Sequence, residues 1–165
     1  MAVRFSTYDA DTSGKGADDL DLFVYDAGGN LVGSSAGATA EESVTMVSPA
    51  ASDYTACVHG FAPADGTSTA FTLSSWVVTP AGAAVPLHAR GLPSQVVPGD
   101  TAKVKLGWHG ATPGVRYLGA LRLAQGANPD TGATLGVTLL SVEPGIPQGI
   151  RGLQSASKAA MLRRR

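Results

Sequence analysis

The segment DLDLFVYDAGGNLVGSS, residues 19–35, begins with an alternation that assigns each side chain to one face of a β-strand. The apolar face consists of Leu20, Leu22 and Val24. The opposite face consists of Asp21, Phe23 and Tyr25. The following DAGGN, residues 26–30, predicts a turn, because glycine and asparagine tolerate positive φ angles. The segment therefore predicts a β-hairpin whose leucines and valine face a core.

Similar short strand patterns recur along the whole chain, separated by turn signals. The 165 residues include 21 Gly and 10 Pro, and helical apolar spacing is almost absent, which favours many short strands joined by turns. We expect strands at residues 3–9, 19–26, 31–36, 42–48, 53–61, 68–78, 85–92, 101–110, 115–124 and 134–142. The predicted fold class is all-β, with two antiparallel β-sandwich modules of jelly-roll or immunoglobulin-like type in series.

The division into two modules rests on composition. TPAGAAVP, residues 79–86, has prolines near both ends and small residues between them, as short linkers do. Residues 1–80 hold two bases and ten acids, a net charge of −8, whereas residues 81–165 hold ten bases and three acids, a net charge of +7. We predict a first domain over 1–79, a linker over 80–86, a second domain over 87–143 and a basic, disordered tail over 144–165.

Several classes of protein are disfavoured by the sequence. The sequence contains no run of about 18 apolar residues, so it predicts no membrane span. MAVRFSTYDADTSG has aspartates where a signal peptide needs an apolar core. The acidic first half does not suit a nucleic-acid surface. The single Cys57 excludes an internal disulfide and is expected to be buried in its strand.

A possible active site is suggested by the order of three short segments. DTSG at residues 11–14, HG at 59–60 and GTSTA at 66–70 follow the Asp, His, Ser order of subtilisin-like proteases, which raises the hypothesis of a stand-alone hydrolase using His59 and Ser68. The serine of such a site opens a helix, however, whereas the residues after Ser68 alternate like a strand. The sequence therefore favours Ser68 in a turn begun by Asp65-Gly66, and no catalytic residue.

Two groups of residues are candidates for binding. The acid cluster consists of Asp9, Asp11, Asp18, Asp19 and Asp21, and such carboxylates could hold calcium; the alternative is a solvated acidic turn. A bidentate glutamate is missing where an EF-hand loop needs one, because Leu20 stands there. Exposed aromatic residues, namely Phe23, Tyr25 and Phe61, could contact protein or polysaccharide surfaces; the alternative is packing under a loop.

The ordered series of segments resembles a known arrangement. DDLDLFVYDAGGNLVGSSAGATAEESVTMVSPAASDYTACVHGF is similar to the pre-peptidase C-terminal domain that follows the catalytic domain of secreted bacterial subtilisin-like serine proteases, particularly actinobacterial ones. VPGDTAKVKLGWHGATPGVRYLGALRLAQG and GVTLLSV resemble the small immunoglobulin- or fibronectin-like module that ends such proteases. The resemblance covers about residues 3–143, and the segment from Gly145 onward matches nothing known to us.

The resemblance implies a non-catalytic accessory region, separated from an upstream catalytic domain that would be its partner. It implies secretion, a role in stability, secretion or substrate attachment, and calcium held in some relatives by acids near the first strands. The second hypothesis is an independent extracellular module that binds protein or polysaccharide.

Overall fold

The computed structural model describes residues 1–80, 85–93, 95–97, 99–126, 128, 131–145 and 159–161, and it is nearly all-β. All strand pairs are antiparallel, as predicted, and the described residues contain no α-helix, only the short 3-10 turn η1 (Asp9–Asp11). Among them, no helix has the length and apolar character needed to span a membrane. The chain divides into two compact units, Met1–Pro80 and Ala81–Arg165.

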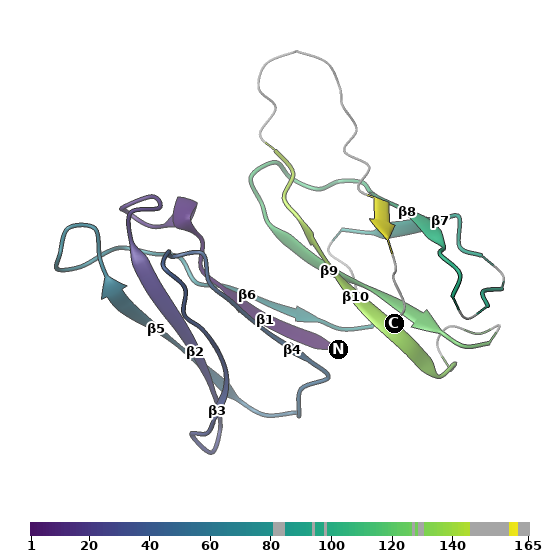
Figure 1. The fold of residues 1–165 in the computed structure, drawn as a ribbon, viewed down its shortest axis with the longest axis horizontal. Helices are drawn as coiled ribbons and strands as arrows, with labels where there is room; N and C mark the ends of the chain where they lie inside the picture. Colours follow the sequence, from purple (N-terminus) through teal and green to yellow (C-terminus); the bar gives the residue numbers. More distant parts are fainter. Residues whose placement is uncertain are drawn as a thin grey trace, which may run out of the picture. The chain divides into compact units, whose positions relative to one another are not determined.

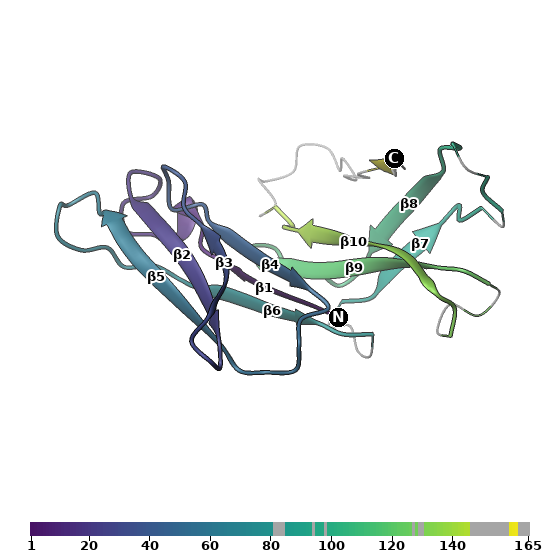
Figure 2. The same ribbon diagram turned by 60° about the horizontal axis from the view of Figure 1, so that its bottom comes forward.

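The first unit consists of two three-stranded sheets (Figures 1 and 2). Its strands are β1 (Ala2–Ser6), β2 (Asp19–Asp26), β3 (Leu31–Ser35), β4 (Ser43–Val47), β5 (Tyr54–Ala62) and β6 (Ser74–Val78). One sheet has the order β4-β1-β6 and the other the order β3-β2-β5. Consecutive strands β3 and β4 therefore belong to different sheets, and β2 occupies the centre of its sheet.

The core of the first unit is formed by the inner faces of both sheets. Leu22 and Val24 of β2 are 0% exposed, and Val44 of β4 is 5% exposed. Partly buried side chains packed against them are Phe5, Met46, Tyr54, Ala56 and Val58. Together with Leu20, 1% exposed, this confirms the predicted inner face of β2.

A glycine lets the two sheets approach closely. Gly33 of β3 lies opposite Val24, and a Cβ added to it would lie 2.5 Å from Cγ1 of Val44 in the other sheet. That separation is shorter than van der Waals contact, so any side chain at position 33 would push against the stiff, β-branched Val44.

The predicted turn between β2 and β3 is organised by Asp26. Its Oδ1 accepts hydrogen bonds from the backbone amides of Gly28 and Asn30, both at 2.9 Å. The amide and side chain of Asn30, followed by the amide of Gly28, hold the pKa of Asp26 below its ordinary value. Gly29 has a φ of 79°, in the left-handed region where glycine is favoured.

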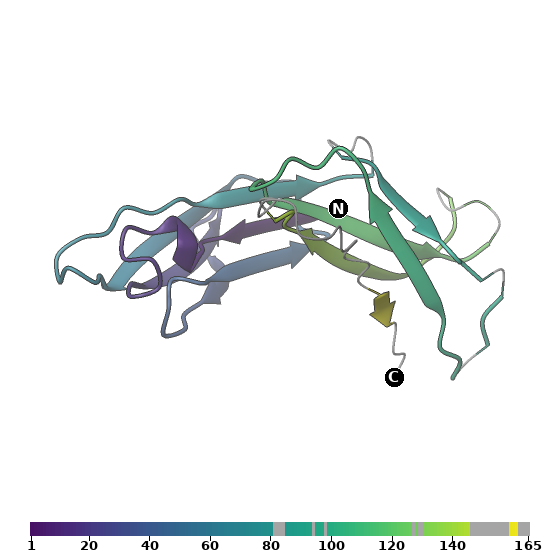
Figure 3. The same ribbon diagram turned by 90° about the horizontal axis from the view of Figure 1, so that it is seen from above.

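The described part of the second unit contains five strands in two sheets. Its strands are drawn in teal, green and yellow in Figure 3. They are β7 (Leu87–Arg90), β8 (Lys103–Trp108), β9 (Tyr117–Ala124), β10 (Thr134–Val142) and β11 (Ala159–Met161). The orders are β10-β9 and β11-β8-β7. Val104 and Leu106 of β8 are the buried apolar residues of this unit within its described part.

Three details differ from the sequence-based expectations. The strand expected from residue 68 begins at Ser74, because residues 69 and 70 are held by Ser13, whose Oγ bonds Thr69 Oγ1 and the Ala70 amide. Cys57 is exposed rather than buried, because its neighbours Ala56 and Val58 take the inner face of β5. Residues 159–161, in the expected disordered tail, pair with β8 at its open edge. The remaining residues after 145, and linker residues 81–84, lie outside the described part.

Candidate functional site

The outer face of β2 and β5 gathers most of the candidate binding residues. The strand register places His59 opposite Asp21, Cys57 opposite Phe23 and Thr55 opposite Tyr25. Opposite residues in antiparallel strands point to the same side of the sheet, so all of these side chains share one face. Leu22 and Val24 of β2 and Ala56 and Val58 of β5 take the inner face, so these side chains project from the opposite side of the sheet.

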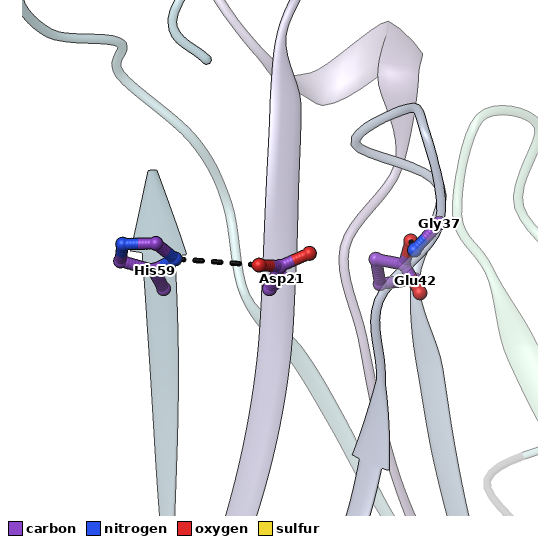
Figure 4. A network of polar contacts seen from close by, with 4 residues as sticks. All are labelled: Asp21, Gly37, Glu42 and His59. Carbon is purple, nitrogen blue, oxygen red and sulfur yellow. Dashed lines mark hydrogen bonds and ion pairs between the residues drawn. The ribbon is translucent and has the colours of Figure 1, made fainter. Parts of the chain in front are cut away.

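An aspartate–histidine pair lies at one end of that face. Nδ1 of His59 donates to Oδ2 of Asp21 at 3.3 Å, as Figure 4 shows. The His59 side chain is 61% exposed, whereas that of Asp21 is 13% exposed. The largely buried carboxylate of Asp21 thus orients the imidazole of His59, and the second ring nitrogen of His59 stays available to a ligand.

Phe61 extends this surface along β5. Its ring packs edge-on against His59, with ring centroids 6.4 Å apart and an interplanar angle of 71°. Phe61 is 67% exposed, whereas Phe23 and Tyr25 are half-buried. The structure therefore brings the three predicted aromatic residues to one sheet and distinguishes Phe61, with His59 beside it, as the accessible part. We call Asp21, His59 and Phe61 the β5 binding patch.

Asp18 has a structural role, because its carboxylate is hydrogen-bonded to three separate loop segments. It is 2% exposed, and its carboxylate accepts hydrogen bonds from the amides of Gly14 at 2.8 Å and Ala64 at 2.9 Å and from Oγ1 of Thr69 at 3.0 Å. The Ala64 amide, then the side chain of Thr12, lower the pKa of Asp18 to about 2. Both carboxylate oxygens are therefore engaged within the protein.

The other acids of the predicted calcium cluster do not share one set of contacts. Oδ1 of Asp9 accepts from the Ala40 amide at 3.0 Å, Asp11 ends η1, and Asp21 bonds His59. Oδ1 of Asp19 is buried without a hydrogen-bond partner. Within the described residues, no three histidine, cysteine or acidic side chains are close enough to hold a metal ion together. In this arrangement the five aspartates do not form one ligand set.

Ser68 lies in a turn organised by Asp65. Oδ1 of Asp65 accepts from the amides of Thr67 at 2.8 Å and Ser68 at 2.7 Å, and these two contacts, that of Ser68 first, lower the pKa of Asp65. The Ser68 hydroxyl donates to Asp65 Oδ2 at 3.5 Å. His59 bonds Asp21, and in the described part of the chain no hydrogen bond joins His59 to Ser68.

Two features were missed by the sequence reasoning. Glu42 is only 4% exposed and accepts hydrogen bonds from the Gly37 amide at 2.6 Å and from the Ser35 hydroxyl, which closes the loop between β3 and β4. Figure 4 shows Glu42 beside Gly37. His88 and His109 lie with ring centroids 5.6 Å apart, although 20 residues separate them in the sequence. Neither contact has a local sequence signal, because each depends on how the strands and loops meet.

A shallow hollow of about 410 Å³ lies beside the β2–β3 turn, between Asp26, Met46 and Tyr54. Asp26 is the charged residue of its lining, and its carboxylate already bonds the turn. The β5 binding patch therefore has more polar and aromatic groups available to contact a ligand than this hollow has.

Comparisons of the chain with protein-family models, with curated proteins and with solved structures found no match. The functional interpretation accordingly depends on the residues of the patch and on their chemistry.

Proposed function

We propose that the chain is the non-catalytic accessory region of a secreted subtilisin-like serine protease, and that it attaches the enzyme to protein or polysaccharide substrates. In this proposal the two units are antiparallel β-sandwich modules of jelly-roll and immunoglobulin-like type. The two sheets of the first unit, packed on Leu22, Val24 and Val44, support that interpretation.

The observation that carries the proposal is the exposure of Phe61 next to the oriented imidazole of His59. An exposed phenylalanine on a sheet gains free energy when a partner covers it, because apolar surface then leaves water. Its flat ring suits a sugar ring or a peptide side chain, and the His59 imidazole adds a hydrogen bond. The patch thus combines apolar contact with a directional polar group, as binding surfaces do.

Replacing Phe61 by alanine is expected to reduce binding to an insoluble substrate about tenfold or more, since truncation of an aromatic anchor commonly costs upwards of 1–2 kcal/mol. The measurement is the fraction of full chain retained on insoluble collagen, casein and chitin across a concentration series. Phe71→Ala is the matched control, because Phe71 is 43% exposed but lies on the segment before β6, outside the patch.

Equal retention of the Phe61→Ala and Phe71→Ala variants would reject the patch as the binding surface. If the unaltered chain were retained on none of the three polymers, substrate attachment itself would be rejected. The reading frame upstream of Met1 tests the accessory role separately: protease segments there support it, whereas a stop codon followed by a ribosome-binding site favours an independent binding module.

Calcium binding by the acid cluster stays a prediction, and thermal unfolding can test it directly. A ligand that binds only the folded chain must raise its unfolding midpoint. Thermal unfolding in calcium and in a chelator should therefore differ if the aspartates rearrange around an ion. Identical midpoints would remove calcium from the proposal.

A further inference from the structure

The outer face of β7 and β8 carries a row of basic side chains in the second unit. Along β8, buried Val104 and Leu106 alternate with exposed Lys103 and Lys105, so both lysines point away from the apolar side. His88 and Arg90 of β7 are also exposed, as is His109 just after β8. We call Lys103, Lys105, Arg90, His88 and His109 the basic row.

The register shows that the basic row is continuous across the two strands. Arg90 lies directly opposite Lys105, and His88 lies opposite Gly107. Because Gly107 has no side chain, and a Cβ there would meet nothing within 4 Å, the His88 ring can lean toward His109 two residues further on. The two imidazoles accordingly lie 5.6 Å apart, with their planes tilted by 49°.

Within the described part of the second unit, no ion pair joins an acidic side chain to the basic row. Like charges directly opposite in a sheet are destabilising, so the Arg90–Lys105 pair opposes folding unless an anion lies nearby. Among the described acids of this unit, Glu143 is paired with Arg116 at 2.9 Å, and Asp100 lies in the turn before β8.

The charge of the row also decides between two kinds of ligand. Two imidazoles at this separation could together bind a divalent metal ion, since each nitrogen would need to lie about 2 Å from it. Three permanent cations on the same face, however, repel a metal ion and attract an anion. Electrostatics therefore favours an anionic ligand over a cation.

We propose that the basic row binds a linear anionic polysaccharide that carries sulfate or phosphate groups. The row is only two strands wide, about 5 Å between strands, and extends along them with a basic residue about every 6.6 Å, which suits a chain better than a flat surface. The three permanent cations are Arg90, Lys103 and Lys105, and the two imidazoles beside them can add hydrogen bonds to the anionic groups.

The test is affinity for heparin, a sulfated polysaccharide, measured with the full chain at pH 7.5 across a salt series. Arg90→Gln and Lys105→Gln should each lower the association constant about fivefold at low salt, the usual contribution of one cation beside an anionic surface. Arg122→Gln, which removes a cation from β9 in the same unit, is the control and should have little effect.

Two outcomes would overturn this proposal. The first is equal heparin affinity for the unaltered chain and the Arg90→Gln, Lys105→Gln double variant, which would assign binding to cations elsewhere, including the basic C-terminal segment. The second is binding to phosphatidylglycerol vesicles or to duplex DNA but not to heparin. The result is independent of the proposed substrate attachment, because the Phe61→Ala variant retains the basic row and should bind heparin normally.

Discussion

Leu22→Ala should destabilise the first unit by about 3 kcal/mol, within the range of about 2–5 kcal/mol measured when a buried leucine is truncated. Leu22 is 0% exposed at the centre of β2, with Val24 and Val44 in the same cluster. The substitution removes apolar contacts from both sheets and leaves a cavity that the surrounding strands can fill only in part. Urea unfolding measures the effect as a lower midpoint with an unchanged slope.

The control for this prediction is Leu31→Ala. Leu31 is 53% exposed on β3, so its truncation should change stability by less than about 0.5 kcal/mol. A Trp108→Phe background leaves Trp76 of β6 as the fluorescent reporter of the first unit. A loss below about 1 kcal/mol for Leu22→Ala, or equal losses for both leucines, would contradict the assignment of the core.

Asp18→Asn should lower the thermal midpoint of the first unit by roughly 5 °C or more at pH 7, because it replaces a carboxylate that holds three loop segments. The pKa of Asp18 falls from 3.8 to about 2, chiefly through the Ala64 amide and the Thr12 side chain, so the folded state favours the ionised form. Its stabilisation is therefore complete above about pH 4 and is lost as the pH falls toward about 2. Melting curves between pH 7 and pH 2 measure this directly.

The comparison of variants isolates Asp18 from other acids. Asp26 and Asp65 also have lowered pKa values, so some acid destabilisation should persist in Asp18→Asn. The difference in midpoint between the unaltered chain and the variant should shrink as the pH falls from about 4 to about 2. Asp53→Asn, which changes an exposed acid before β5 with no such contacts to three loop segments, should leave the thermal midpoint at pH 7 nearly unchanged. A difference constant from pH 7 to pH 2 would refute the carboxylate's role.

Strand positions could be predicted from the sequence because their signals are local. The alternation of Leu20, Leu22 and Val24 predicted the buried face of β2, and the observed strand has the predicted bounds, Asp19–Asp26. The turn at residues 26–30 followed from its own glycines and asparagine. A period of two residues is a property of neighbouring side chains, so no distant contact is needed to recognise it.

The structure differs from the sequence-based expectations where the contacts of a residue depend on segments distant in the chain. The acids of residues 9–21 look like one cluster in the sequence, yet Asp18 bonds Ala64 and Thr69, and Asp21 bonds His59. Cys57 reads as a core residue within an apolar strand, but the register opposite Phe23 turns it outward.

Sequence alone therefore determined the nearly all-β character of the described residues, the approximate positions of most strands and the inner face of β2. Only the tertiary structure decided which side chains meet: His59 with Asp21, Arg90 opposite Lys105, and His88 beside His109. The physical reason is that strand register and loop closure bring together residues far apart in the chain. Such pairings depend on how whole sheets pack, and no single segment of the sequence determines that packing.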